Sequence, residues 1–497
     1  MSPRQLKIFA LFGGAVALAV CLGYGIATES YRSIILLSVL VVFTALLVIP
    51  GYIPLLVFGL LTPFTVPLPL IWNFPLMLLA LGTCILKYWL QHGLAPQLKS
   101  TSINTVTLAM GLFFAWVFVR YCMKPSIPNV MGFGRNVTGF RAYLNYGISF
   151  GLLFFLGRFV VNRAGFLTLM RWMAGICIAY SLLFIIFSLS KSVWIATLVL
   201  TYGSMFVDFF DNGFLRFVAL PEFGLILLSL ALLPHLLKLN RVQWWGIVLL
   251  AIAAVIMGGN RSSLGMAFII VVTIPFLRGK SRQAATIASS VVIVSLAAYF
   301  GGPALSRLPH TGFLRSLALI SPELALSTRA GETMEWRETQ WDLAAIQIKE
   351  HPIIGRGYGG LENAFEFADP SQLDQAVFDI DLATGGIHNG YIACALAFGI
   401  PAALLFVYIL SSQIMGNARR AAKIHRDDPV AAEMHCFVCA HLLSFACAIY
   451  IGTDLNSPFI WFLLGLGVLT TNVKLAEKKK AKAVPPVFAQ PTLARAV

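Results

Sequence analysis

Charged residues are scarce in this sequence. Only 11% of the 497 residues are Asp, Glu, Lys or Arg, whereas 58% are hydrophobic. Soluble domains carry about 25% charged residues, so this composition excludes an ordinary soluble protein and indicates a polytopic membrane protein. Backbone polar groups in lipid must be satisfied within their own segment, and alternation at period two is weak. We therefore expect an all-α protein with membrane-spanning helices rather than a β-barrel.

Two motifs of well-known chemistries are also missing, because the sequence contains neither an HExxH zinc motif nor a Walker A loop. Acidic residues are nearly lacking within the apolar runs, and Glu222 and Asp454 stand near their ends, which disfavours a proton-coupled transporter. Cys436 and Cys439 form a CxxC inside an apolar run without a second pair, which favours packing over a metal site. We expect neither a metal nor a cofactor.

Positive charge is present in excess, with a net charge of +15. The basic residues gather in short connections between apolar runs, as the positive-inside rule requires, so nucleic acid is a disfavoured partner. The same rule predicts that both termini are cytoplasmic and that the long polar stretch 302–388 faces outward. The apolar run after Lys7 lacks a convincing cleavage site, so we expect a retained first span rather than a signal peptide.

Apolar windows predict about 12 to 14 spans. They divide the chain into a transmembrane bundle at 1–301, an external loop at 302–388, C-terminal spans at 389–474 and a disordered cytoplasmic tail at 475–497. The first four spans are expected within residues 6–88. The others are expected near 103–122, 139–160, 167–188, 216–237, 242–258, 262–277, 284–301, 389–411, 432–452 and 457–474.

The polar stretch 302–388 is too long for a simple tether between spans, because loops beyond about 15 residues are usually functional or disordered. It holds twelve of the 21 acidic residues of the chain. Within it, residues 332–351 read as an amphipathic helix that His351-Pro352 ends. Its apolar side is expected to comprise Trp336, Trp341, Ala345, Ile346 and Ile348. We interpret the stretch as half of an active site.

The turn Gly258-Gly259-Asn260-Arg261-Ser262-Ser263 between two spans is the first candidate site. An arginine at membrane depth is costly and therefore indicates a functional site. Its guanidinium fork, together with exposed backbone N–H groups at a helix start, suits a phosphate. The alternative is that Arg261 only reaches to the interface or caps a helix.

A second candidate is Arg337 with Trp341, which are spaced i and i+4 on the predicted loop helix and share one face. The alternative is a solvated face on which Arg337 pairs with Glu338 or Asp342. Arg329 is a nearby competitor for the same role.

The third candidate is His388-Asn389, where the polar stretch meets the next apolar run. A histidine titrates near neutrality and can act as a general base, and a neighbouring amide can orient a hydroxyl. A plain role in starting the next helix is the alternative.

In order, these features resemble the O-antigen ligase and polymerase superfamily, which includes exopolysaccharide polymerases. The resemblance rests on the Gly-Asn-Arg-Ser-Ser turn, the Arg-x-x-x-Trp of the loop, His351-Pro-Ile-Ile-Gly-Arg-Gly-Tyr-Gly and the His388-Asn-Gly-Tyr-Ile that opens a span. It covers residues 221–399. Gly399 matches a glycine of the family pattern, whereas Ala402 departs from the residue type often seen in ligases, and Arg356 stands where many relatives have an apolar residue.

The resemblance implies a metal-independent, inverting glycosyltransferase of the bacterial inner membrane that acts on its periplasmic face. The donor would be an oligosaccharide on undecaprenyl diphosphate, and the acceptor a sugar hydroxyl on a glycan or on lipid A core. His388 would deprotonate that hydroxyl, while Arg261 and Arg337 would bind the diphosphate. Further substrate contacts would come from Asn260, Asn389, Trp341, Arg141 and Arg329. Membrane lipids and a chain-length regulator are the other partners it suggests.

Ligase and polymerase both remain open at this point, and protein O-glycosylation is a smaller alternative. A transporter or flippase of lipid-linked glycan is an alternative of a different class, as is an assembly partner without catalysis. A transporter should bury charged residues at mid-membrane and show paired halves, whereas a transferase gathers its polar residues at one face beneath the loop. The sequence favours the transferase.

Overall fold

The computed structural model describes the helical body of the chain and part of the polar stretch. The described residues are 82, 105–123, 140–158, 163–190, 207–209, 215–217, 220–258, 261–307, 320–327, 332–358, 387–425, 427–451, 455 and 460–471. The spans predicted within 6–88 and the tail 475–497 therefore lie outside the described residues, apart from residue 82.

The described chain forms helices almost throughout, in agreement with the all-α expectation. Their bounds are α5 Thr105–Met123, α6 Phe140–Arg158, α7 Arg163–Ser190, α9 Leu220–Ala231, α10 Pro234–Leu237, α11 Arg241–Met257, α12 Arg261–Leu277, α13 Ser281–Leu305, α15 Pro322–Ser327, α16 Glu332–Glu350, α18 Gly390–Phe398, α19 Ile400–Ile424 and α20 Pro429–Ile451. A last apolar helix covers Ile460–Thr471. Between α7 and α9, β1 (Val207–Phe209) and β2 (Leu215–Phe217) form a small antiparallel pair.

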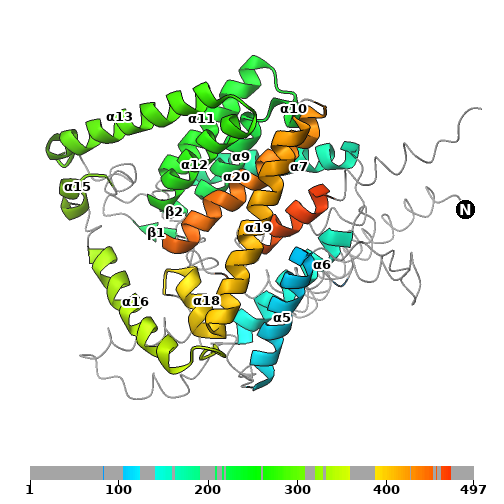
Figure 1. The fold of residues 1–497 in the computed structure, drawn as a ribbon. Coiled ribbons are helices and arrows are strands. Elements are labelled where there is room, and N and C mark those ends of the chain that lie inside the picture. Colours follow the sequence, from blue (N-terminus) through cyan, green and yellow to red (C-terminus); the bar gives the residue numbers. More distant parts are fainter. Residues whose placement is uncertain are drawn as a thin grey trace, which may run out of the picture.

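Helix α20 lies at the centre of the bundle. It packs against α12 and α19, while α9 packs against α11 and α7 (Figure 1). The last helix places Trp461, which is fully buried, among aromatic rings of α5, α6 and α19. Aromatic rings in contact prefer tilted and edge-to-face arrangements, and such pairs stabilise the fold beyond the effect of burying apolar area. They join helices that are far apart in sequence into one core.

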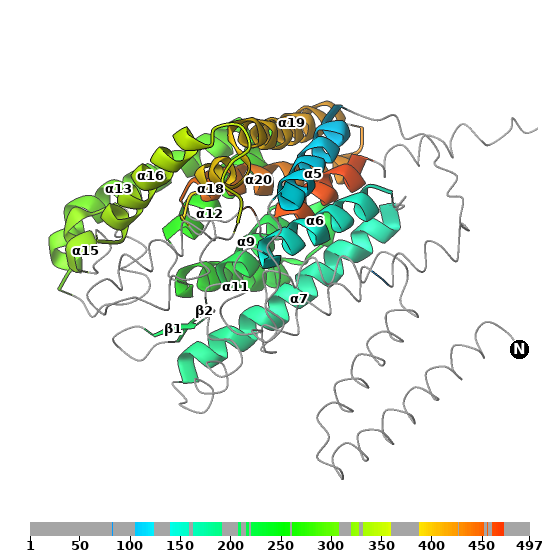
Figure 2. The same ribbon diagram turned by 90° about the horizontal axis from the view of Figure 1, so that it is seen from below.

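Five described helices are long and apolar enough to cross a membrane, and α13 is the most peripheral of them. It runs along the edge of the body (Figure 2) with only 11% of its most apolar window buried. Its exposed residues include Ile293 and Phe300, which are 66% and 77% exposed. A large apolar surface of this kind fits contact with lipid.

Most predicted spans correspond to single helices, but the span expected at 389–411 is wrong. The chain instead breaks at Gly399, between α18 and a longer helix α19 that continues to Ile424. Gly399 has φ 86°, which favours glycine, and Pro401 follows in the first turn of α19. The span expected at 216–237 is similarly divided into α9 and α10, because Pro234 starts a new helix.

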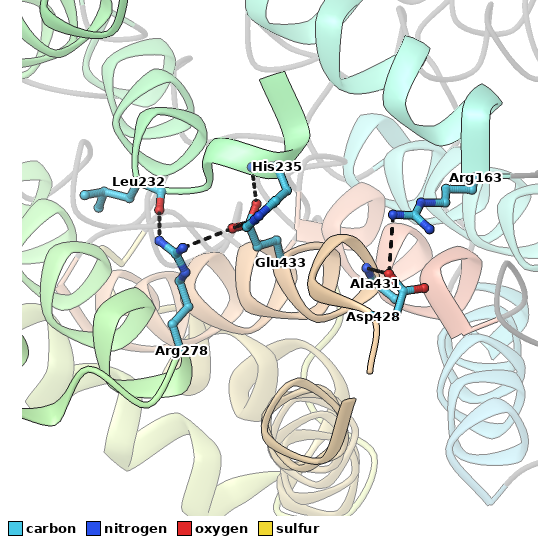
Figure 3. A network of polar contacts seen from close by, with 7 residues as sticks. All are labelled: Arg163, Leu232, His235, Arg278, Asp428, Ala431 and Glu433. Atoms are coloured by element: carbon cyan, nitrogen blue, oxygen red, sulfur yellow. Dashed lines mark hydrogen bonds and ion pairs between the residues drawn. The ribbon is translucent and has the colours of Figure 1, made fainter. Parts of the chain in front are cut away.

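A polar network marks one end of the bundle (Figure 3). Glu433 is fully buried at the start of α20 and accepts a hydrogen bond from the backbone N–H of His235, at 2.8 Å. Its Oε1 lies 2.7 Å from Nδ1 of His235 and 3.4 Å from Nη2 of Arg278, which follows α12. Arg163 pairs with Asp428 beside it, at 3.6 Å. The network joins the end of α12 to the start of α20, so these two packed helices run antiparallel.

Candidate functional site

The site is built on the contact between α16 and α18. Trp336, Gln340, Ala344 and Ile348 are spaced four residues apart along α16, and Gln340 and Ala344 are fully buried. Side chains at this spacing form one stripe on a helix, and here the stripe packs on Ile387 and α18. The helix predicted at 332–351 is therefore confirmed. Its predicted apolar side is partly wrong, because Ala345 and Ile346 are exposed.

His388 lies in the turn that precedes α18, with a φ of 49°. This left-handed conformation is uncommon for any residue other than glycine and is found where the surroundings hold it in place, often at functional sites. The next residue, Asn389, is buried, and its Oδ1 accepts hydrogen bonds from the backbone N–H groups of Tyr391 and Ile392 at 3.1 and 3.2 Å. Asn389 therefore caps α18 and fixes the position from which His388 projects.

Two tryptophans of α16 hold this turn. The Trp341 Nε1 donates a hydrogen bond to the carbonyl oxygen of Ile387, at 3.0 Å. The Trp336 ring lies against the His388 ring, with 5.6 Å between centroids. The Trp341 ring also contacts Tyr450 of α20, at 5.7 Å. The loop helix, the histidine turn and the central helix of the bundle thus meet at one place.

Arg337 supplies a positive charge beside His388. Burial, and to a lesser extent the charge of Arg337, lowers the pKa of His388 from its ordinary value. Burial also lowers the pKa of Arg337, but a guanidinium stays charged in proteins. In the part of the chain that the structure describes, Arg337 forms no ion pair with Glu338 or Asp342, which are both exposed. The pair thus combines a neutral imidazole, able to accept a proton, with a cation able to stabilise negative charge.

Arg261 begins α12, and its side chain lies outside the described part of the structure. Its level in the bundle follows from the antiparallel pairing of α12 with α20. Arg261 lies 17 residues before Arg278 (278 − 261), and Tyr450 lies 17 residues after Glu433 (450 − 433). Both intervals correspond to about 25 Å of helix, so the start of α12 is level with Tyr450 and hence with Trp341.

The other predicted contacts are less fully described. Asn260 and Arg329 lie outside the described residues, and Arg141 lies in the first turn of α6 with its side chain outside them. Their roles remain predictions. The structure thus brings together Arg337, Trp341, His388 and Asn389. The start of α12, where Arg261 lies, is at the same level along the bundle as Trp341.

Sequence reasoning missed how the segment after α16 is held. The backbone N–H of Arg356 donates to the carbonyl of Leu396 at 2.7 Å, and that of Gly357 donates to Ala397 at 2.9 Å. Gly355 and Gly357 both have positive φ. A Cβ on Gly355 would lie 2.5 Å from the backbone nitrogen of Phe398. The closely spaced glycines were the sequence signal for this arrangement. They allow the backbone of residues 355–357 to lie directly against the end of α18.

Gly399 offers a test of this approach. A Cβ there would lie 2.0 Å from the carbonyl oxygen of Ile353, and its φ of 86° disfavours any side chain. We expect Gly399→Ala to lower the free energy of unfolding by at least about 2 kcal/mol. Thermal unfolding of the purified protein in detergent measures the change. Gly416→Ala, inside α19 where a Cβ meets nothing within 4 Å, is the control and should unfold at or slightly above the wild-type temperature.

A family model matches the part of the chain that contains this site. Residues 246–407 match the family model described as O-antigen ligase. The match contains Arg261, Arg337 and His388, and Arg141 lies before it. No curated protein matches the chain at a significant level.

Proposed function

We propose that this chain is a glycosyltransferase of the O-antigen ligase and polymerase type, which transfers a glycan from undecaprenyl diphosphate to a sugar hydroxyl. The match of residues 246–407 to the O-antigen ligase family model supports the proposal. The proposal specifies a single transfer site formed by His388, Arg337 and Arg261, without a metal ion. Trp341 and Asn389 position this site, and Asn260, Arg141 and Arg329 are further proposed contacts to the substrate.

One observation carries the proposal. Within the matched region, His388 is held in a left-handed conformation just before α18, where burial and, less strongly, the charge of Arg337 lower its pKa. A histidine with a lowered pKa is neutral at pH 7 and is ready to accept a proton. The neighbouring Arg337 cannot act as the base, but it can bind phosphate oxygens with its fork of N–H donors.

The proposed reaction is one displacement. His388 accepts the proton of the acceptor hydroxyl while that oxygen attacks the anomeric carbon of the donor sugar. The bond from the anomeric carbon to the phosphate oxygen breaks, and its electron pair leaves on undecaprenyl diphosphate. Arg337 and Arg261 stabilise the charge that develops on the diphosphate, a role that a divalent cation has in other enzymes. A single displacement inverts the configuration of the anomeric carbon.

The distribution of charge supports a periplasmic site. The network around Glu433 and the basic residues Arg278, Lys280 and Arg282 lie at the ends of α12 and α20 that are remote from His388. By the positive-inside rule, that end faces the cytoplasm. The His388 end then faces outward in the inner membrane, where lipid-linked glycans would arrive laterally from the bilayer.

A reconstitution experiment tests the proposal. Purified protein is incubated with lipid-linked repeat units alone, or with added lipid A core, and the glycan products are sized. Extension with repeat units alone assigns a polymerase, and a product that forms only with lipid A core assigns a ligase. A transporter of lipid-linked glycan is the second candidate. Movement of the intact donor across a bilayer, without a new glycosidic bond under either condition, would assign that function and contradict a transferase.

A further inference from the structure

A second cationic feature lies outside the His388 site. Arg120, in the last turn of α5, is only 8% exposed. One Nη atom donates a hydrogen bond to the backbone carbonyl of Arg356, and its Nε is buried with no hydrogen-bond partner. Across the residues that the structure describes, no carboxylate forms an ion pair with Arg120. A buried cation of this kind is costly without a counter-charge, which indicates that an anion completes the site.

Arg356 supplies a second guanidinium group, on the same segment whose backbone Arg120 binds. Its backbone pairs with the end of α18, while its Nη1 donates to the Oε1 of Gln347 on α16. A Cβ on the adjacent Gly357 would lie 2.9 Å from the Nη2 of Arg120, so the Arg120 head group lies directly against this segment. In the described ranges Arg356 also lacks a carboxylate partner. Two arginines from distant parts of the chain therefore share one short segment without an observed counter-ion.

Tyrosine side chains lie beside Arg120 and the segment that it binds. The hydroxyl of Tyr143 accepts a hydrogen bond from the backbone N–H of Tyr358 at 3.3 Å, and the two rings lie 5.5 Å apart. The Tyr121 ring lies 5.1 Å from that of Tyr143. The aromatic rings offer apolar faces to a ligand, and the neighbouring guanidinium offers N–H donors to an oxyanion.

The position of this pair relates it to the His388 site. His388 precedes α18, whereas Leu396 and Ala397, which hold the Arg356 segment, lie near its end. Eight residues separate His388 from Leu396 (396 − 388), which corresponds to about 12 Å along a helix. A short oligosaccharide can span this distance while one of its sugars lies at His388.

We propose that Arg120 and Arg356 form an anion-binding subsite for the glycan, which recognises the carboxylate or phosphate of an acidic sugar. The glycan as ligand rests on the proposed function, but the oxyanion chemistry rests on the two guanidinium groups alone. The subsite differs from the proposed diphosphate contacts at Arg261 and Arg337 by its place at the other end of α18. It would make this chain selective for acidic glycans.

Arg356→Gln is the informative variant, because it removes the charge and leaves the backbone carbonyl that Arg120 binds. Purified protein in nanodiscs of neutral lipid is titrated with tetragalacturonic acid and, separately, with the matching neutral galactose tetrasaccharide. We expect the wild type to bind the acidic probe at least about tenfold more tightly, and Arg356→Gln to lose most of that preference. Arg120→Lys keeps one charge without the fork and should weaken acidic-probe binding while neutral-probe binding stays unchanged.

Lys349→Gln is the matched control, since it removes an exposed charge from the last turn of α16 and should leave both titrations unchanged. Equal binding of the two probes by the wild type, or an unchanged preference in Arg356→Gln, would overturn the subsite. The wild type could instead distinguish anionic from neutral lipid without distinguishing the two sugar probes. That result would assign the arginines to a phospholipid headgroup and would also overturn the proposed glycan subsite. The titrations require no glycosyl transfer. Failure of the subsite is therefore distinct from failure of the proposed function, which the reconstitution with lipid-linked repeat units tests.

Discussion

Replacing His388 with asparagine is expected to lower the rate of glycan transfer by about 10²- to 10⁴-fold, the range typical of a lost general base. Asparagine tolerates the positive φ of this position better than alanine does, so the turn before α18 should persist while the proton acceptor is removed. The measurement is the single-turnover rate of transfer by purified protein at saturating donor.

His351→Asn provides the matched control. His351 is exposed at the end of α16, outside the contact between α16 and α18, and its replacement should leave the rate within about twofold of the wild type. A His388→Asn protein that folds normally and transfers glycan at the wild-type rate would refute the assignment of His388 as the base.

Replacing Arg337 with glutamine is expected to lower the transfer rate by about 10²- to 10³-fold, because it removes a preorganised donor to the leaving diphosphate. Arg337→Lys keeps the charge without the bidentate fork and should recover only part of the rate. Lys349→Gln again serves as the control on the same helix. A loss confined to KM for the donor, with kcat unchanged, would contradict a role in the transition state.

The pH dependence of the Arg337→Gln protein gives an independent readout. In the wild type, burial and the Arg337 charge hold the pKa of His388 below its ordinary value of 6.5, so activity should fall only as the pH drops through that lowered pKa. Without the Arg337 charge, His388 binds its proton more readily, and its pKa rises. The acid limb of the residual pH–rate profile should therefore move to higher pH. An unmoved or lowered acid limb would show that the two groups do not interact.

Much of the helical body could be predicted from hydrophobic run length alone. Spans expected at 103–122, 242–258 and 262–277 differ from α5, α11 and α12 by at most three residues at either end. The loop helix was also predicted, because the His351-Pro352 stop is local. These features depend on local hydrophobic composition and on helix-breaking residues, both of which can be read directly from the sequence.

The details of the site could not be predicted in the same way. The break at Gly399 depends on the approach of Ile353, a residue 46 positions earlier (399 − 353), and no local pattern encodes that contact. The buried side of α16 was partly mistaken, because Ile346 is 55% exposed although it is apolar. Single apolar residues are common on protein surfaces, so hydrophobic periodicity alone did not identify the packed face of α16.

The central claim is that His388 and Arg337 act together on one glycosyl transfer, and a double-mutant cycle tests it most directly. Single-turnover transfer rates are measured for the wild type, His388→Asn, Arg337→Gln and the double variant. Residues that act as a unit have effects that do not multiply. We predict a double variant within about tenfold of the slower single variant. Losses that multiply fully, or single variants as fast as the wild type, would contradict the claim.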